Sequence, residues 1–316
     1  MTIKEIIPPV ERSLIENELT ESTMICKTFK ANRQVHIIDC HNAPNTLREI
    51  GRLREVTFRD ASGGTGKEID LDEFDLSPKN PFKQLIVWDP TDREIIGGYR
   101  YIEGHKLEIN EDGNVSTPTA HLFDFSKEFI ANYLPYTIEL GRSFVQPAYQ
   151  PQNNPRKGLF SLDNIWDGLG ALVFSKPETK YFFGKITMYL SYDKYARDLI
   201  LFFLNKHFGD RDKLVVPHEP LTYFGDASEY EKLFNADNYE DDYKILNKEV
   251  RKRETHIPPL VNAYMNLSKT MLFFGTSLNK EFGDVEESGI LLFIDDVKEE
   301  KKERYIDLVI NKNKEE

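Results

Sequence analysis

Two opposite charges lie three residues apart in YTIELGRSFVQP, residues 136–147, a segment otherwise typical of a buried strand. On a regular strand Glu139 and Arg142 would face opposite sides of a sheet, because side chains alternate. A bulge at Gly141 would break this alternation and let the two charges share one site. A buried carboxylate can then accept a proton from a substrate, and a guanidinium can bind a substrate carboxylate. The alternative is a buried structural ion pair.

Further charges precede this segment in the chain. They are Arg54, the acids Asp70, Asp72 and Asp75 of EIDLDEFD (68–75), and Arg100 in GGYRY. The arginines could pair with the acids, either to fix a loop or to recognise the carboxylate of an amino acid. A structural network of ion pairs with solvated loop acids is the alternative for all five.

Familiar catalytic motifs do not fit this sequence. The loop SGGTGKE (62–68) lacks the first glycine of a phosphate-binding loop, and Glu68 stands where that motif needs Ser or Thr. There is no G-x-S-x-G motif, and Cys26 and Cys40 are far apart with no ligand or redox spacing. The seven histidines show no metal-ligand spacing. The sequence therefore predicts no metal site and favours chemistry without a covalent intermediate.

Composition limits the class of protein. The 316 residues are 40% apolar, which is enough for a packed core, and the net charge of −12 argues against nucleic-acid binding. The apolar runs are too short to span a membrane and the start lacks the apolar core of a signal peptide, so we expect a cytoplasmic protein. Basic residues concentrate in NPRKG (154–158) and NKEVRKRE (247–254). These could dock an acidic partner or an anionic ligand, or simply be solvated.

The apolar periodicity predicts which elements position these charges. Helices are expected at 43–59, 161–176 and 193–209, and strands at 84–104, 136–145 and 180–190. This pattern predicts an α+β (α/β layered) fold with a mixed central sheet flanked by helices. We expect residues 1–32 to form an N-terminal arm, 33–210 the core, and 211–316 a C-terminal α/β extension packed on it.

The motifs LREVTF, KEIDLDEFD, IIGGYRY and ELGRSFV occur in an order that resembles the acyl-homoserine-lactone-synthase-like branch of the GNAT acyltransferases. The chain is more similar still to bacterial hemolysin-like enzymes that N-acylate ornithine or glycine. NIWDGL, YFFGKITM and IPPLVNAYMNLS extend this resemblance over about residues 35–310. The chain departs from the family at Asp70, where glutamate is usual, and at Gly141, where serine is common. QNNPRKGL (152–159) replaces the GNAT pyrophosphate loop.

The resemblance implies a GNAT-like fold and an N-acyltransferase that moves a long acyl chain, 3-hydroxylated or not, to the amine of glycine or ornithine. The acyl donor would be the thioester of acyl carrier protein (acyl-ACP) or of CoA (acyl-CoA), with no permanently bound cofactor. The product would be a lyso-amino-acid lipid, which implies transient contact with the inner membrane surface. Glu139 and Arg142 would be catalytic. The resemblance assigns substrate binding to Arg54, Asp70, Asp72, Asp75 and Arg100, and donor binding to Arg156, Lys157, Phe182 and Phe183.

Other interpretations remain open at this point. Phe182 and Phe183 could line an acyl channel or belong to the core, and Arg156 and Lys157 could be solvated charges. A non-catalytic module could keep the GNAT scaffold to hold a lipid or a protein partner. An autoinducer synthase of the acyl-homoserine-lactone type is disfavoured, because the chain continues well beyond the core that such an enzyme needs.

Overall fold

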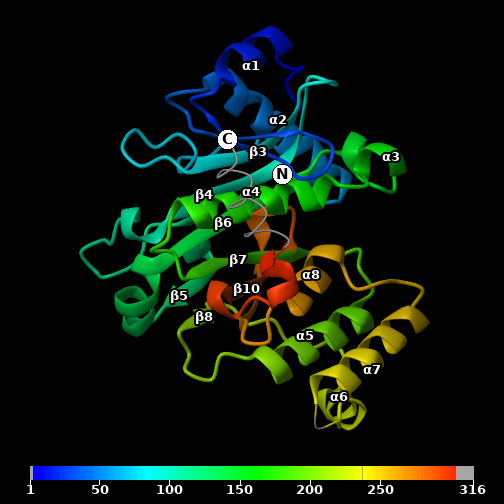
Figure 1. The fold of residues 1–316 in the computed structure, drawn as a ribbon. Coiled ribbons are helices and arrows are strands. Elements are labelled where there is room, and N and C mark those ends of the chain that lie inside the picture. Colours follow the sequence, from blue (N-terminus) through cyan, green and yellow to red (C-terminus); the bar gives the residue numbers. More distant parts are fainter. Residues whose placement is uncertain (1–2, 237, 304–316) are drawn as a thin grey trace. The chain divides into compact units, whose positions relative to one another are not determined.

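The computed structural model describes residues 3–236 and 238–303 (Figure 1). The chain forms two compact units. Unit 1 takes its described residues from Met1–Leu107, Tyr136–Lys180 and Lys298–Glu316, and unit 2 from Glu108–Pro135 and Tyr181–Val297. Among the described residues no helix combines the length and the apolar character needed to cross a membrane.

Unit 1 is built on an antiparallel sheet. Its strands lie in the order β1 (Met24–Lys27), β2 (Gln34–Ile38), β3 (Lys83–Asp89), β4 (Glu94–Glu103) and β6 (Thr137–Val145). In β4, a side chain at Gly97 would clash with the carbonyl of Phe144, and one at Gly98 with the carbonyl of Leu85. The two glycines of IIGGYRY therefore allow β3 and β6 to approach β4 closely.

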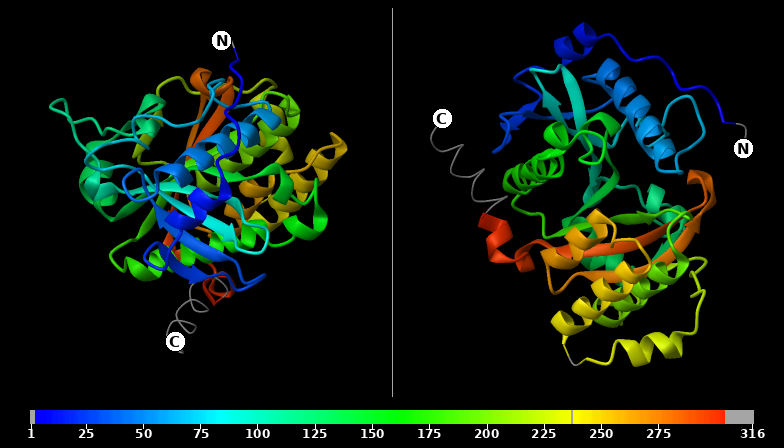
Figure 2. Two further views of the ribbon diagram at one scale, coloured as in Figure 1. Left: turned by 90° about the horizontal axis from the view of Figure 1, so that it is seen from above. Right: turned by 90° about the vertical axis from the view of Figure 1, so that its right-hand side faces the viewer.

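Helices cover both faces of this sheet (Figure 2). These helices are α2 (Pro44–Asp60) and α4 (Ser161–Ser175), and unit 1 also contains α1 (Arg12–Glu18), α3 (Pro155–Gly158) and α9 (Glu299–Lys302). A Cβ at Gly168 of α4 would lie 2.8 Å from the Leu85 side chain, whereas Gln84, the preceding residue of β3, contacts Arg54 of α2. Because consecutive strand residues face opposite sides, α2 and α4 lie on opposite faces of the sheet.

Unit 2 contains further strands and helices. Strands β7 (Tyr181–Met188), β10 (Val285–Phe293) and β9 (Leu272–Asn279) pair antiparallel in that order, and β5 (Phe123–Phe125) pairs with β8 (Val215–Pro217). The helices are α5 (Lys194–Phe208), α6 (Ala227–Leu233), α7 (Tyr239–Lys252) and α8 (Pro259–Leu267). Residues Phe129–Tyr133 form a π-helical turn.

The structure confirms the predicted fold class of helices on a central sheet. The helices expected at 43–59, 161–176 and 193–209 are α2, α4 and α5, and the strands expected at 136–145 and 180–190 are β6 and β7. These elements were predictable because each carries a strong local apolar pattern. The division into an arm (1–32), a core (33–210) and an extension (211–316) stays a prediction.

Candidate active site

The acidic loop that follows α2 lies directly against that helix. The amide of Asp70 donates a hydrogen bond to the carbonyl of Gly51 (3.1 Å). A Cβ at Gly51 would lie only 2.7 Å from Ile69 and 2.8 Å from Leu71. Because Gly51 has no side chain, the loop can approach α2 closely enough to bring Asp70 next to Arg54.

The first part of the same loop is held by a carboxylate on α2, that of Glu55. Glu55 is fully buried, and it accepts hydrogen bonds from the amide of Thr65 (3.1 Å), the hydroxyl of Thr65 (2.7 Å) and the amide of Gly66 (2.8 Å). Gly64 and Gly66 have φ values of 96° and 71°, which favour glycine. The glycine-rich loop SGGTG thus folds around an internal carboxylate, and α2 anchors both parts of the loop.

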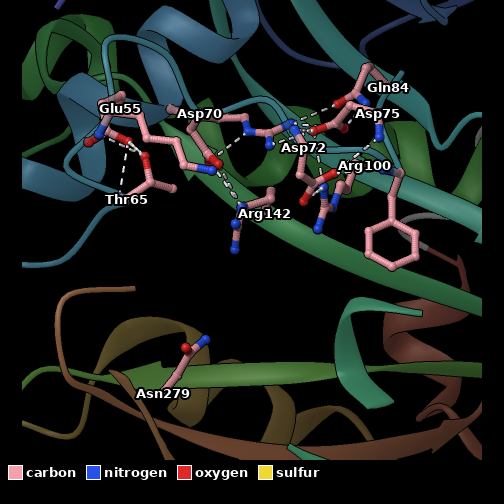
Figure 3. Close-up of polar contacts among 12 residues, drawn as sticks. Glu55, Thr65, Asp70, Asp72, Asp75, Gln84, Arg100, Arg142 and Asn279 are labelled. Carbon is pink, nitrogen blue, oxygen red and sulfur yellow. Dashed lines mark hydrogen bonds and ion pairs between the residues drawn. The ribbon is translucent and has the colours of Figure 1, made fainter. Parts of the chain in front are cut away.

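Six charged side chains form a series of ion pairs that we call the charge chain (Figure 3). It runs from Asp72 to Arg100 (2.7 Å), Asp75 (3.0 Å), Arg54 (3.0 Å), Asp70 (3.0 Å) and Arg142 (2.9 Å), each distance joining a carboxylate oxygen to a guanidinium nitrogen. The four inner side chains are at most 2% exposed, whereas those of Asp72 and Arg142 are 19% and 16% exposed. Only the two ends, which have opposite charge, are accessible.

The neighbouring charges keep the inner acids ionised. Burial alone would raise the pKa of Asp70, but Arg142 and Arg54 hold it below its usual value. Burial opposes ionisation of Asp75 as well, and there Arg54 and Arg100 lower the pKa. Burial lowers the pKa of the Arg142 guanidinium, and Asp70 opposes this effect. An arginine stays protonated in proteins, so Asp70, Asp75 and the three arginines carry charge at neutral pH.

The predicted bulge in β6 is confirmed, with its position corrected by one residue. Gly141 keeps its regular pairing with Arg100, and Phe144 pairs with Gly98. Two residues of β6, Arg142 and Ser143, therefore stand opposite the single residue between these partners on β4. Arg142 itself adopts the left-handed conformation, with φ = 49°. The bulge turns its side chain toward Asp70 and so toward the face covered by α2 (Figure 3).

Glu139 lies on this same face of the sheet. It pairs with Ile102, two residues from Arg100 on β4, and side chains two residues apart on a strand share a face. Its side chain is buried, and the residue is 3% exposed. The bulge thus places Glu139 and Arg142 on one side of the sheet, as the sequence predicted, and the ion pair of Arg142 is made with Asp70.

Three supporting residues were not found by reasoning from the sequence. Gln84 is buried beside Arg100 and donates a hydrogen bond to Asp75 (2.9 Å); Gly51 and Glu55 hold the loop. A glutamine inside the apolar strand KQLIVW and a glycine inside a helical pattern were the available signals.

The residues expected to bind the donor fall in different units. Arg156 and Lys157 are exposed on α3 in unit 1, where Lys157 pairs with Asp92 (2.8 Å). Phe182 and Phe183 lie on β7 in unit 2. Phe183 is 1% exposed and packs, at ring-centroid distances of 5.5–5.9 Å, against Phe125, Phe129 and Phe274. Phe183 is thus part of an aromatic core, and donor binding by these residues stays a prediction.

Comparison with known proteins identifies the family. A family model described as an acetyltransferase (GNAT) domain matches residues 53–157, a range that contains the whole charge chain and Glu139. A glycine N(alpha)-acyltransferase of Phocaeicola vulgatus is 51% identical over 313 residues, which cover 99% of this chain and 96% of the relative. Another, of Bacteroides thetaiotaomicron, is 54% identical over 308 residues, or 98% and 91% of the two chains. The chain belongs to the glycine N(alpha)-acyltransferase family.

The protein is therefore an acyltransferase with a GNAT domain, and the predicted N-acyl transfer is confirmed at this level. Its substrates are an acyl donor and an amine acceptor. The alternative of a non-catalytic module is set aside. A solved structure of a CoA-dependent acyl-homoserine lactone synthase, BjaI, with SAM and isopentyl-CoA aligns over 89% of each chain with 8% identity and a TM-score of 0.37. This likeness is too weak to support a conclusion about fold or activity.

Proposed function

We propose that this enzyme transfers a long acyl chain from a phosphopantetheine thioester, carried by acyl carrier protein or CoA, to the amine of glycine. The observation that carries the proposal is the identity of 51–54%, over nearly the whole chain, with two glycine N(alpha)-acyltransferases. This observation favours glycine over ornithine as the acceptor. The product is an N-acylglycine, a single-chain amino-acid lipid that a cytoplasmic enzyme would deliver to the inner membrane surface.

The accessible ends of the charge chain suit a zwitterionic acceptor. Arg142 offers a partly exposed guanidinium, which binds the carboxylate of glycine. Asp70 and the left-handed backbone at residue 142 fix the direction of this side chain. Each of the four inner residues is paired with two opposite charges, so together they position the two ends of the charge chain.

Glu139 acts as the base in this mechanism. Glycine enters as an ammonium ion and loses one proton to the carboxylate, directly or through a water molecule. The neutral amine nitrogen attacks the thioester carbonyl carbon, the carbon–sulfur bond breaks and the amide bond forms. The nitrogen loses its second proton, so that one proton ends on the thiol sulfur and the other passes to solvent. Positioning of the two substrates supplies much of the rate, and no acyl-enzyme is needed.

The decisive experiment is mass spectrometry of lipids from a bacterial host that expresses the enzyme and is fed labelled glycine. We expect a new lipid whose mass contains one labelled glycine and one acyl chain. Glu139→Gln should lower its formation by about 10²–10⁴-fold, the usual contribution of a general base. Glu103→Gln is the matched control, since Glu103 is also a buried strand glutamate of unit 1 but pairs with Lys106 and Lys176.

Other outcomes of this experiment are equally clear. A new lipid that contains ornithine would overturn the choice of acceptor and leave N-acyl transfer standing. Equal loss in both variants would remove Glu139 from its role as base. Turnover by the purified enzyme with acyl-ACP and with acyl-CoA, measured side by side, identifies the donor.

A further inference from the structure

The turn between β1 and β2 presents an aromatic side chain to solvent. Ala31 and Asn32 are both left-handed, with φ values of 66° and 47°, and the amide of Thr28 donates to the carbonyl of Arg33 (2.7 Å). Phe29 at the tip is 53% exposed, and the ammonium of Lys30 lies 4.9 Å from its ring centroid. The hairpin, dark blue in Figure 2, is the edge of the unit 1 sheet. A tight, hydrogen-bonded turn thus holds an apolar ring away from any core.

A second exposed apolar side chain belongs to the same part of unit 1. Leu159, directly after α3, is 63% exposed. Arg33 joins the two segments, because its guanidinium donates to the carbonyl of Lys157 (3.1 Å) and to the side chain of Asn164 (3.0 Å). The side-chain amide of Asn164 in turn donates a hydrogen bond to the carbonyl of Lys30 (2.9 Å).

Both segments are basic on an acidic protein. Residues 22–38 and 154–160 contain lysine and arginine but no aspartate or glutamate, although the net charge of the chain is −12. Arg33 and Lys157 are already paired with Asp89 and Asp92, and the carboxylate of Asp167 on α4 accepts a hydrogen bond from the backbone amide of Phe29 (2.9 Å). Lys27, Lys30 and Arg156 are exposed. Together with Phe29 and Leu159 they form what we call the basic tip.

We propose that the basic tip binds an anionic membrane surface. Exposed cations near an anionic bilayer strengthen binding by about fivefold each, and a single aromatic or aliphatic side chain can enter the headgroup region without a complementary pocket. An acidic protein would be attracted by the same charges. However, the two separated apolar side chains, Phe29 and Leu159, suit a soft lipid interface better than a rigid protein partner. The inference concerns where the enzyme is held and does not depend on which amine it acylates.

The test is co-sedimentation of the purified full-length enzyme with vesicles of phosphatidylcholine, with and without phosphatidylglycerol. We expect binding only to the anionic vesicles, weakened by added salt. Lys27→Gln combined with Lys30→Gln should lower the affinity by about 25-fold, and Phe29→Ser by about tenfold. All three positions are exposed, so circular dichroism of the variants should match that of the wild type.

Phe224 provides a matched control. It is 72% exposed in unit 2, and Lys194 lies 5.4 Å from its ring centroid, so its chemistry copies that of Phe29. The segment that follows it, GDASEYE, is acidic. Phe224→Ser should therefore leave vesicle binding unchanged. The proposal is overturned if the enzyme ignores anionic vesicles, or if Phe224→Ser weakens binding as much as Phe29→Ser. Charge-dependent binding to acyl carrier protein that is insensitive to Phe29→Ser, without vesicle binding, would assign the basic tip to that carrier instead.

Discussion

The Arg142→Gly variant should be more stable than the Arg142→Ala variant. Inside a strand, alanine is usually the more stabilising of the two residues. Arg142 has φ = 49°, a conformation that costs a residue with a Cβ about 1–2 kcal/mol. Glycine avoids this cost but loses about 0.4–1 kcal/mol through the greater freedom of the unfolded chain. Arg142→Gly and Arg142→Ala lose the same ion pair with Asp70, so their difference isolates the backbone. We expect the glycine variant to be more stable by about 0.5–1 kcal/mol.

Tryptophan fluorescence during urea unfolding measures this difference. Both tryptophans, Trp88 and Trp166, are buried and lie in unit 1 together with β6, so the signal reports the unit that contains the substitution. Val145, a regularly paired residue of the same strand, is the control position. There the alanine variant should be the more stable by about 0.5–1 kcal/mol, as in ordinary strands.

Two results would refute this reasoning. If Arg142→Ala is as stable as Arg142→Gly, then residue 142 is not held in the left-handed conformation. If Arg142→Gly keeps the wild-type KM for glycine, the guanidinium does not bind the acceptor carboxylate, and only the shape of the strand matters.

Further predictions follow from other buried contacts. Gly51→Ala should destabilise unit 1 by about 1–3 kcal/mol and lower kcat, because the new methyl group displaces Ile69 and Leu71 and with them Asp70; wild-type turnover would contradict this. Burial lowers the pKa of His36 to about 4, so protonation of the unfolded chain should reduce stability as the pH falls from about 6.5 to 4, by up to about 3 kcal/mol. His36→Gln should flatten the pH dependence of unfolding in that window. Phe183→Ala should cost about 3–5 kcal/mol in thermal unfolding if Phe183 is core, and little if it lines an open channel.

Local patterns in the sequence were sufficient for most of the fold. The amphipathic spacing in α2 and the apolar run of β6 each predict their own element. The pairing of Arg54 and Arg100 with the loop acids was also predictable, since buried charges need partners. The π-helical turn at Phe129–Tyr133 could not be predicted, because the hydrogen-bond pattern of one turn leaves no mark in residue types.

Long-range contacts decided the remaining details of the site. The sequence placed the bulge at Gly141, the residue that most readily adopts unusual dihedral angles. The structure instead keeps Gly141 paired with Arg100 and strains Arg142, whose guanidinium reaches an acid 72 residues earlier in the chain. Neither the closeness of Asp70 to α2 nor the alternation of the six charges can be derived from spacing, because both depend on how the loop crosses Gly51.

The charge chain also constrains how this enzyme can evolve. Each inner residue contacts two opposite charges, so a single replacement leaves neighbours unmatched in a buried setting, at a cost of about 3–5 kcal/mol. Inner positions should therefore change in concert, for example when Arg54 and Asp75 are both replaced by apolar residues. Asp72 and Arg142 stand at the ends of the charge chain and are partly exposed, so they can vary one at a time. A lineage that adopts a new acceptor should accumulate its first substitutions at these two positions and retain the inner four.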